Sequence, residues 1–328
     1  MATFIKRSVL KPKGTAYTMA GPGSFKLGDD ARDVDIALSD HQSLHHFDLE
    51  RRRTCWVDAG RFISDREGAF FYQEQRRNAR AVLFASFEDA LRLDAPLTRR
   101  PVLFFSIGRC GSTLISKIAQ TCGLDTWSEP DSFTNLNRAR GLRRGQPDLV
   151  RALTHLALSD LDRLSTGAAF GVKLRAEVTQ TMGSIMDTAP DAVSFFVLRD
   201  AVEWARSSRR VFGVDEHQSA RRLVKMILAA RQAVEAGHDL RVLDYRRMVT
   251  QPQTVAAMIC DAAGLPLPDT ARLDRTMQTD SQQGTSINRE SSRFDLPGDF
   301  DDRFRQALSA IAPDLDPHDA QGWIAPRG

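Results

Sequence analysis

A buried strand, a tight turn and an amphipathic helix follow one another without a break after residue 101. The apolar run Val102–Ile107 leads into the turn at residues 108–113, and apolar residues then recur at helical spacing as far as Cys122. Glycines let the turn bend sharply, and a helix start leaves unpaired N–H groups at the positive end of its dipole. The segment predicts an α/β domain with an anion-binding loop, to which Arg109 adds a guanidinium. The alternative is an ordinary strand-to-helix connection with a solvated Arg109.

The loop differs from that of a nucleoside triphosphatase, which has the pattern Gly-x-x-x-x-Gly-Lys-Ser/Thr. Only two residues separate Gly108 from Gly111, and no lysine follows Gly111. The loop is too short to wrap a triphosphate in the same manner. A single 5′-phosphate that carries a further group fits it better.

A second cluster follows another apolar run of strand length, Val193–Leu198. Arg199 and Asp200 stand at the end of this run, where open parallel sheets bind ligands. Ser207 lies eight residues beyond Arg199 along a predicted helix, which is roughly 12 Å along the helix axis. The two side chains can hold one phosphate only if it lies beside that helix. The alternative is an ion pair that starts the helix.

Together the two clusters resemble the sulfotransferase family that uses 3′-phosphoadenosine 5′-phosphosulfate (PAPS). In that family an Arg/Lys-Ser-Gly-Thr-Thr loop holds the 5′-phosphosulfate, an arginine and a serine eight residues later hold the 3′-phosphate, and a tyrosine lies near the adenine. The matching positions here are Gly108, Arg109, Cys110, Gly111, Ser112 and Thr113, then Arg199 and Ser207, then Tyr245. Cys110 and Ser112 depart from the family pattern, as do Arg246 and Arg247. The resemblance covers about residues 100–295.

The resemblance implies a parallel sheet flanked by helices in the P-loop NTPase-like sulfotransferase fold, with an N-terminal extension. It implies sulfuryl transfer from PAPS to a hydroxyl or amine of a small-molecule or peptide acceptor. The other product is 3′-phosphoadenosine 5′-phosphate (PAP), and no metal is needed. Arg109 is assigned to the sulfuryl and bridging oxygens, and the amides and hydroxyls of the loop to the 5′-phosphate. A late arginine, Arg289 or Arg293, is assigned to the 3′-phosphate.

Two further catalytic residues are carried over from the family. Lys173 at the end of a predicted strand resembles the lysine that stabilises the transition state, with an exposed strand-end lysine as the alternative. The base of the small-molecule branch is a histidine at the position of Arg175. Glu129 instead stands where the tyrosyl-protein branch has its glutamate, and Trp127 beside it is expected to raise its pKa. The alternative for Glu129 is an exposed helix-capping acid ahead of Pro130.

Composition narrows the function classes. The chain has 328 residues, 42% of them hydrophobic, which suits one large α/β domain with additions. Lys+Arg of 45 against Asp+Glu of 42 gives a net charge of only +3, which argues against a nucleic-acid binder. The four cysteines form no Cys-x-x-Cys pair, so reduced thiols are expected, and Cys110 is either a packed residue or a thiolate favoured by the helix start. The absence of a signal or membrane-spanning stretch favours a cytoplasmic protein without a membrane partner.

The chain is expected to divide at residue 98. Residues 1–98 are expected to form an N-terminal extension that covers the acceptor site, with a structural or dimer-forming extension as the alternative, and residues 99–328 are expected to form the catalytic domain. His41 and His45 have the spacing of metal ligands on one helix face, against the alternative of packed or solvated histidines. An amphipathic stretch runs from Gln75 to Leu93. Further strands are predicted at 169–174 and 241–243, and helices at 217–237 and 254–263.

Two other function classes stay open beside the sulfotransferase. A nucleotide kinase-like phosphotransferase would need magnesium and a lysine in its loop. A non-catalytic module that keeps the nucleotide pocket is the other, and loss of Lys173 and Glu129 from the pocket would favour it. The sequence leaves the oligomeric state open.

Overall fold

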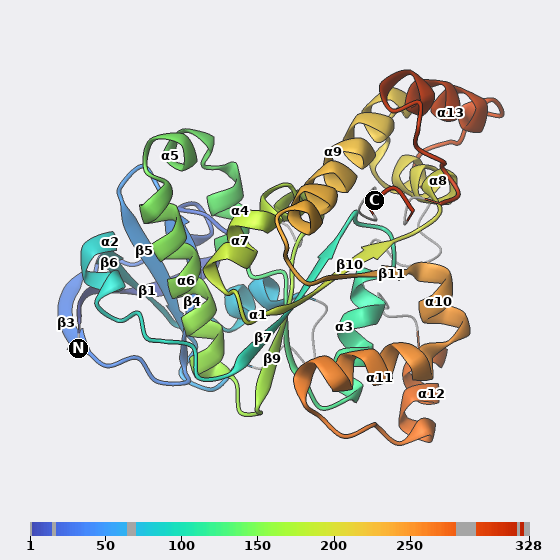
Figure 1. The fold of residues 1–328 in the computed structure, drawn as a ribbon. Coiled ribbons are helices and arrows are strands. Elements are labelled where there is room, and N and C mark those ends of the chain that lie inside the picture. The colour runs from blue at the N-terminus through green and yellow to red at the C-terminus, as the bar shows by residue number, and fades with distance from the viewer. Residues whose placement is uncertain (1, 15–17, 64–69, 280–292, 320–321, 325–328) are drawn as a thin grey trace. The chain divides into compact units, whose positions relative to one another are not determined.

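The computed structural model describes residues 2–14, 18–63, 70–279, 293–319 and 322–324 (Figure 1). The chain divides into two compact units that alternate along the sequence. Unit 1 comprises Met1–Pro101 and Asp125–Val172, and unit 2 comprises Val102–Leu124 and Lys173–Gly328. The boundary expected at residue 98 lies near the end of the first segment of unit 1. That unit also takes in a second segment, which the sequence did not indicate.

A five-stranded sheet has the order β11-β10-β7-β9-β8. Its strands are β7 (Arg100–Ser106), β8 (Asp125–Ser128), β9 (Ala169–Lys173), β10 (Val193–Leu198) and β11 (Leu240–Asp244). Strand β10 pairs in parallel with β7 on one side and with β11 on the other. Strands β9 and β10 are buried throughout, as uninterrupted apolar runs are in a parallel sheet covered on both faces. The predicted α/β class, with a parallel sheet flanked by helices, is confirmed.

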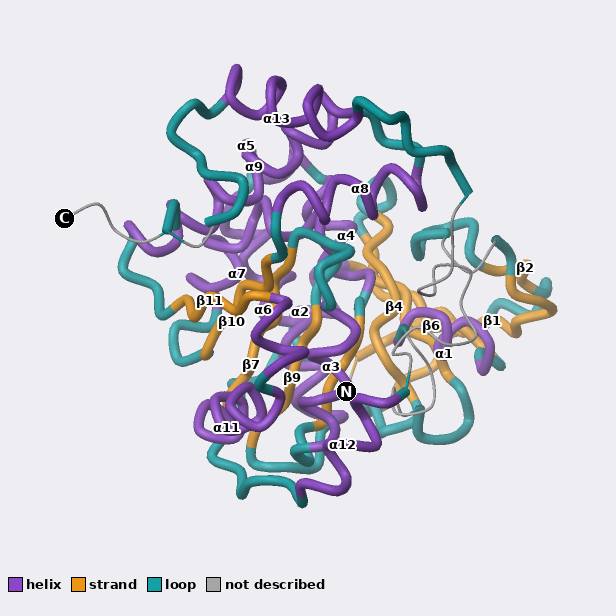
Figure 2. The backbone as a smooth tube through the Cα atoms, turned by 90° about the vertical axis from the view of Figure 1, so that its right-hand side faces the viewer, coloured by secondary structure: helices purple, strands orange, loops and turns teal. Residues whose placement is uncertain are grey.

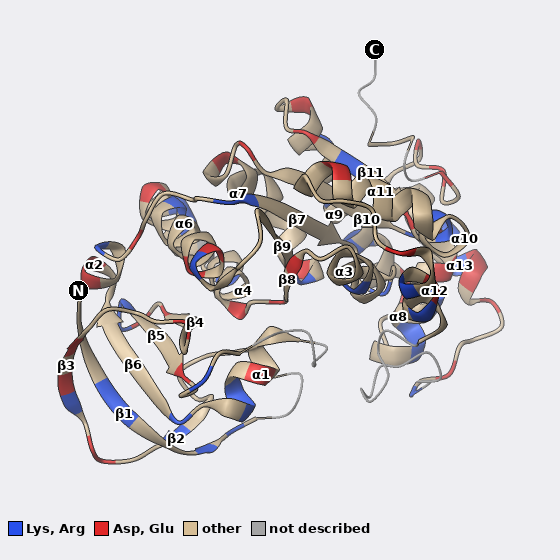
Figure 3. Cartoon of the chain, turned by 90° about the horizontal axis from the view of Figure 1, so that it is seen from below, with Lys and Arg blue, Asp and Glu red and all other residues tan. Residues whose placement is uncertain are grey.

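The helices of unit 2 are α3 (Ser112–Thr121), the 3₁₀ helix η1 (Ala176–Thr181), α7 (Met182–Thr188), α8 (Ala201–Phe212), α9 (Glu216–Glu235), α10 (Tyr245–Thr250), α11 (Pro252–Ala263), α12 (Thr270–Gln278) and α13 (Phe300–Ile311). Four of them, α3, α8, α9 and α11, lie close to their predicted positions, and the other helices of the unit were not predicted. The predicted stop of α11 is confirmed at Gly264, whose φ of 65° is left-handed. Basic residues occur on α8, α10 and α12 (Figure 3).

The C-terminal helix of unit 2 is fastened to α8 and α9. Asp301 on α13 pairs with Arg206 on α8, and Arg303 pairs with Glu216 on α9 at 2.6 Å. The start of α8 is fastened as well, because the backbone N–H of Ala201 donates to a carbonyl of the C-terminal segment at 2.9 Å. The helix that follows β10 is therefore held along its length.

Unit 1 contains a six-stranded antiparallel sheet in the order β2-β1-β6-β5-β4, with β3 paired to β1. Strands β1, β2, β4 and β6 of this sheet are labelled in Figure 2. The strands are β1 (Ala2–Pro12), β2 (Phe25–Leu27), β3 (Arg32–Ile36), β4 (Gln42–Asp48), β5 (Arg53–Asp58) and β6 (Ala81–Ser86). Its helices are α1 (Phe71–Asn78), α2 (Phe87–Leu91), α4 (Asp131–Arg138), α5 (Arg140–Gly145) and α6 (Pro147–Leu164).

The stretch from Gln75 to Leu93 is not one continuous element. Helix α1 ends at Asn78, the buried strand β6 follows, and α2 begins at Phe87. Residues 81–86 form a strand because β6 pairs with β1 and β5 on its two sides, and Val82 and Leu83 are fully buried there. Sheet pairing of this kind overrides the local periodicity of the sequence.

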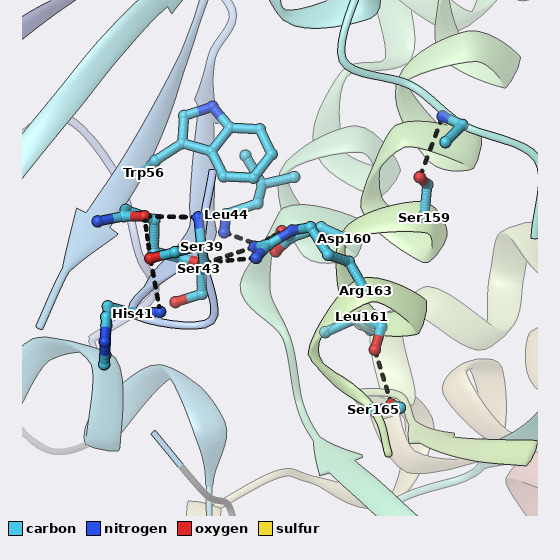
Figure 4. Close-up of polar contacts among 12 residues, drawn as sticks. Ser39, His41, Ser43, Leu44, Trp56, Ser159, Asp160, Leu161, Arg163 and Ser165 are labelled. Atoms are coloured by element: carbon cyan, nitrogen blue, oxygen red, sulfur yellow. Dashed lines mark hydrogen bonds and ion pairs between the residues drawn. The ribbon is translucent and has the colours of Figure 1, made fainter. Parts of the chain in front are cut away.

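The two segments of unit 1 are joined by buried polar contacts. The backbone N–H of Leu44 on β4 donates to Asp160 on α6 at 2.7 Å, and Arg163 pairs with Asp160 at 2.5 Å while donating to the carbonyl of Ser39 (Figure 4). On α4, Asn135 accepts a hydrogen bond from the backbone N–H of Phe47 at 3.1 Å. Because unpaired buried polar groups are costly, these contacts make residues 1–98 and 125–172 fold as one unit.

Within the described residues, the helices are all too short or too polar to cross a membrane.

Candidate functional site

The loop between β7 and α3 is wound through left-handed backbone. Gly108, Arg109 and Gly111 have φ of 71°, 50° and 85°. The Ser106 hydroxyl accepts a hydrogen bond from the N–H of Gly108 at 3.3 Å, and the Cys110 thiol donates to the carbonyl of Val197 at 3.2 Å. The glycines therefore stand where the turn requires left-handed conformations. Arg109 adopts one without being glycine, a strain typical of functional sites.

Helix α3 opens directly onto this loop. Its N-cap is Gly111, which offers no side-chain cap, and its first turn contains no acidic residue. Ser112 and Thr113 are buried, at 9% and 4% exposed, whereas Gly108, Arg109 and Gly111 are partly exposed. The positive end of α3 is thus not offset by a carboxylate of its own first turn, as an anion site requires.

Cys110 is a packed residue of the loop and not a thiolate. It is fully buried, and burial raises the pKa of its thiol to about 11, although nearby groups that include Lys173 counteract part of this effect. The cost of removing the thiolate from water exceeds the stabilisation that the start of α3 was expected to give it.

Alkaline pH is expected to test this burial. Because the pKa of Cys110 is raised from 9.0 to about 11, its contribution to stability is complete below pH 9 and is lost as the pH rises toward 11. The stability of the wild type should fall with pH more steeply than that of Cys110→Ala, by about 1.4 kcal/mol per pH unit in this window. Urea unfolding at pH 8.5 and 10.5 measures the difference. Equal slopes in the two proteins would contradict a buried neutral thiol.

Two contacts fasten α8 to the loop. The Arg109 Nε donates to the Ser207 Oγ at 3.2 Å, across 98 residues of sequence. The indole Nε1 of Trp204 donates to the carbonyls of Ile107 and Gly108, at 3.2 and 2.8 Å. The structure therefore brings Arg109 and Ser207 together, although the sequence assigned Arg109 to the sulfuryl and bridging oxygens and Ser207 to the 3′-phosphate. The sequence analysis did not predict a role for Trp204. The only indication of it in the sequence is a large aromatic residue one helical turn before Ser207.

Arg199 lies between a carboxylate and an aromatic ring. Its Nε and Nη2 approach one Glu203 oxygen, Oε2, at 3.0 and 2.9 Å, and its guanidinium stacks over the Tyr245 ring with 4.8 Å to the centroid. Asp200 caps α8 by accepting the N–H of Glu203 at 2.9 Å. The ion pair expected as the alternative for Arg199 is present, with Glu203 in place of Asp200 as partner.

Tyr245 connects Arg199 to the loop. A Cβ added at Gly111 would lie 2.5 Å from the Tyr245 Cδ2 and 2.9 Å from the Met248 Cε. The tyrosine ring thus packs against the bare Cα of Gly111 on one side and Arg199 on another. Within unit 2, the three motifs identified in the sequence meet at one place.

Lys173 ends β9 and is 2% exposed, so the expectation of an exposed strand-end lysine is wrong. Its positive charge favours the thiolate of Cys110 and so counteracts part of the rise that burial causes in the pKa of that thiol. The following N–H, that of Leu174, donates to the carbonyl of Phe104 at 3.0 Å and holds the strand end against β7.

Glu129 belongs to unit 1, directly after β8, and is half-buried. It is not the helix cap of the alternative, because the N-cap of α4 is Pro130. Its φ of 55° is left-handed, and among the described non-glycine residues only Arg52, Arg109 and Glu129 have such a value. Trp127 is buried against Phe71, with 4.8 Å between the ring centroids. The assignment of Glu129 as the base stays a prediction.

Of the two late arginines assigned to the 3′-phosphate, the structure describes only Arg293. Arg289 lies outside the described residues. The backbone N–H of Arg293 donates to the carbonyl of Arg210 at 2.8 Å, near the end of α8. The role of either arginine at the 3′-phosphate stays a prediction.

The helical arrangement expected for His41 and His45 is wrong. His45 lies on strand β4, whose first residue is Gln42, so the two histidines do not share a helix face. His45 is fully buried with Nδ1 3.3 Å from the Gln75 Oε1, and burial lowers its pKa well below the usual value. In the described part of the chain, histidine, cysteine and acidic side chains form no group of three that could hold a metal ion.

The chain is similar to solved structures of sulfotransferases, the family that its motifs resemble. A sulfotransferase from Mycobacterium avium aligns with a TM-score of 0.43 and 14% identity, over 69% of this chain and 79% of that one. The sulfotransferase domain of the Synechococcus olefin synthase aligns at 0.39 and 15%, over 67% and 98%. A retinol dehydratase in complex with androsterone and the inactive cofactor PAP aligns at 0.35 and 13%, over 72% and 84%. No protein-family model and no curated protein sequence matches the chain.

Proposed function

We propose that this protein is a sulfotransferase that moves a sulfuryl group from PAPS to a hydroxyl or amine of a small-molecule or peptide acceptor. The observation that carries the proposal is the meeting of three distant motifs in unit 2. Arg109 bonds to Ser207, and Tyr245 packs between Gly111 and Arg199. Their meeting supports the assignment of the loop, the arginine–serine pair and the tyrosine to one nucleotide.

The residues of the loop suit a phosphosulfate. The donor supplies the sulfuryl group on a 5′-phosphate that leaves in the transfer. The N–H groups at the start of α3 and the hydroxyls of Ser112 and Thr113 are assigned to that phosphate, because helix starts bind anions. Arg109 and the buried ammonium of Lys173 are assigned to the negative charge that develops on the oxygens during transfer.

The acceptor needs a base, and Glu129 is the residue assigned to it. A carboxylate can remove the acceptor proton as the new bond to sulfur forms, which typically contributes 10²–10⁴-fold to the rate. Residues 1–98 fold with the segment that carries Glu129, and their expected role in covering the acceptor stays a prediction.

Nucleotide-dependent stabilisation is expected to test the cofactor. PAP should raise the melting temperature clearly, whereas adenosine 5′-phosphate (AMP), which lacks the 3′-phosphate, should raise it much less. The shift at a fixed nucleotide concentration is measured by calorimetry. Equal shifts would remove the role of Arg199 and Ser207, and a response to magnesium ATP alone would favour the kinase-like function.

Turnover separates an enzyme from a non-catalytic binding module. The protein is incubated with labelled PAPS and a metabolite extract, and sulfated products are sought by mass spectrometry. A labelled product that depends on the protein supports the proposal. Binding of PAP with no product from extract or peptide acceptors would favour the binding module.

A further inference from the structure

Three polar residues form one stripe: Glu203 and Ser207 on α8, and Arg199 just before the N-cap of that helix. Glu203 and Ser207 are four residues apart, so they lie on the same face of α8, about 6 Å apart along its axis. Arg199 contacts Glu203 from four residues before it, so Glu203 stands between the other two. A phosphate that bridges Arg199 and Ser207 must therefore lie over Glu203.

The carboxylate of Glu203 already occupies the donors that such a phosphate needs. Its Oε2 accepts a hydrogen bond from the Arg199 Nε at 3.0 Å and forms an ion pair with the Arg199 Nη2 at 2.9 Å. This is the edge of the guanidinium that binds phosphate oxygens in a forked arrangement. The side chains of Arg199 and Glu203 are 26% and 54% exposed, so the pair lies at the surface and exchanges partners at modest cost.

Arg199 can change partners without leaving its place. Its guanidinium stacks on Tyr245, whose ring is held against Gly111, so the plane of the guanidinium stays fixed. At the other end of the stripe, the Ser207 hydroxyl accepts from Arg109 and can still donate its own proton. For a phosphate to bind Arg199, the carboxylate of Glu203 therefore has to release the guanidinium.

We propose that Glu203 determines how strongly this site prefers a 3′-phosphorylated nucleotide, by competing with the 3′-phosphate for Arg199. The inference rests on the proposed function. A nucleotide with a free 3′-hydroxyl leaves the Arg199–Glu203 pair intact and can donate its hydroxyl proton to the carboxylate. A 3′-phosphate has to displace the carboxylate and lies beside its negative charge. Glu203 thus lowers the affinity for PAP and leaves that for AMP unaffected or slightly raised.

Glu203→Gln is expected to tighten PAP binding about five-fold, since exposed ion pairs are worth up to about 1 kcal/mol. AMP affinity should change by less than about two-fold, because AMP has no group that competes for Arg199. The ratio of the two affinities, measured by isothermal titration calorimetry, is a readout that general loss of structure would not raise. A PAP affinity that is unchanged or weaker in Glu203→Gln overturns the inference.

Helix α9 offers a matched control. Arg231 and Glu235 form the same four-residue pair, with 2.7 Å between Nε and Oε1 and exposures of 23% and 50%. Glu235→Gln removes an equal charge from unit 2 and should leave the PAP-to-AMP ratio unchanged. The same rise in both variants would attribute the effect to net charge and overturn the role of Glu203.

A second background tests whether Glu203 acts through Arg199. In Arg199→Ala the further change Glu203→Gln should give little of the five-fold gain, because there is no guanidinium to release. A full gain in that background overturns the competition. Failure of the proposed function gives a different result, since the wild type would then bind PAP no better than AMP.

Discussion

Glu129→Gln is expected to lower turnover by about 10²–10⁴-fold while leaving the affinity for PAP within about two-fold. Glutamine keeps the size and hydrogen-bonding shape of the side chain but cannot accept the acceptor proton. The backbone at Glu129 is left-handed, a strained conformation that often occurs at functional sites, and Glu129 does not cap α4. Steady-state kinetics and calorimetric PAP titration together separate chemistry from binding.

The control for this variant is a carboxylate in the same unit. Glu88 lies in the first turn of α2 and is exposed, so Glu88→Gln removes one negative charge from unit 1 and should keep normal turnover. Arg109→Ala, in contrast, should harm PAP binding and turnover alike. Near-normal turnover of Glu129→Gln would show that this glutamate is structural and that another group is the base.

Gly111→Ala is expected to reduce PAP binding and turnover by on the order of 10²-fold, since small displacements of a positioned site have effects of this size. The new Cβ would lie 2.5 Å from the Tyr245 ring, so the ring has to move, and Arg199 loses the surface on which it stacks. In addition, the φ of 85° disfavours any side chain by about 1–2 kcal/mol. Melting temperature and PAP affinity are both measured.

Gly123 separates these two effects. It follows the other end of α3 with a φ of 88°, but a Cβ there would meet no atom within 4 Å among the described residues. Gly123→Ala should therefore lose stability from backbone strain and keep its affinity for PAP. An equal loss of affinity in both alanine variants would contradict a role for the packing of Tyr245 on Gly111.

Local patterns predicted the loop and its flanking elements well. A run of apolar residues, two glycines and a helical apolar stripe lie within about twenty residues, and each acts through neighbours in the sequence. Strand β10 was predicted at its observed bounds, and α9 within two residues of them, for the same reason. Strand β6 escaped prediction because its burial depends on β1 and β5, which lie far from it in sequence.

In the candidate site too, local features were predicted from the sequence and contacts between distant residues were not. Its residue types and spacings suggested one nucleotide for the loop, the arginine–serine pair and the tyrosine. The contacts that join them were beyond prediction, because they connect residues far apart in the chain. No local pattern indicated that Arg109 would bond to Ser207, or that Tyr245 would pack against Gly111.

The sequence by itself determined which strand and helix flank the loop and which chemical groups the loop carries. The reason is that hydrogen bonding within a turn and the periodicity of a helix involve only neighbouring residues. Tertiary structure alone decided the environment of each group. Packing buried Lys173 and the thiol of Cys110, and it joined residues 1–98 to 125–172 in one unit. The physical reason is that burial and ion pairing depend on which distant segments meet, and this depends on the free energy of the whole fold.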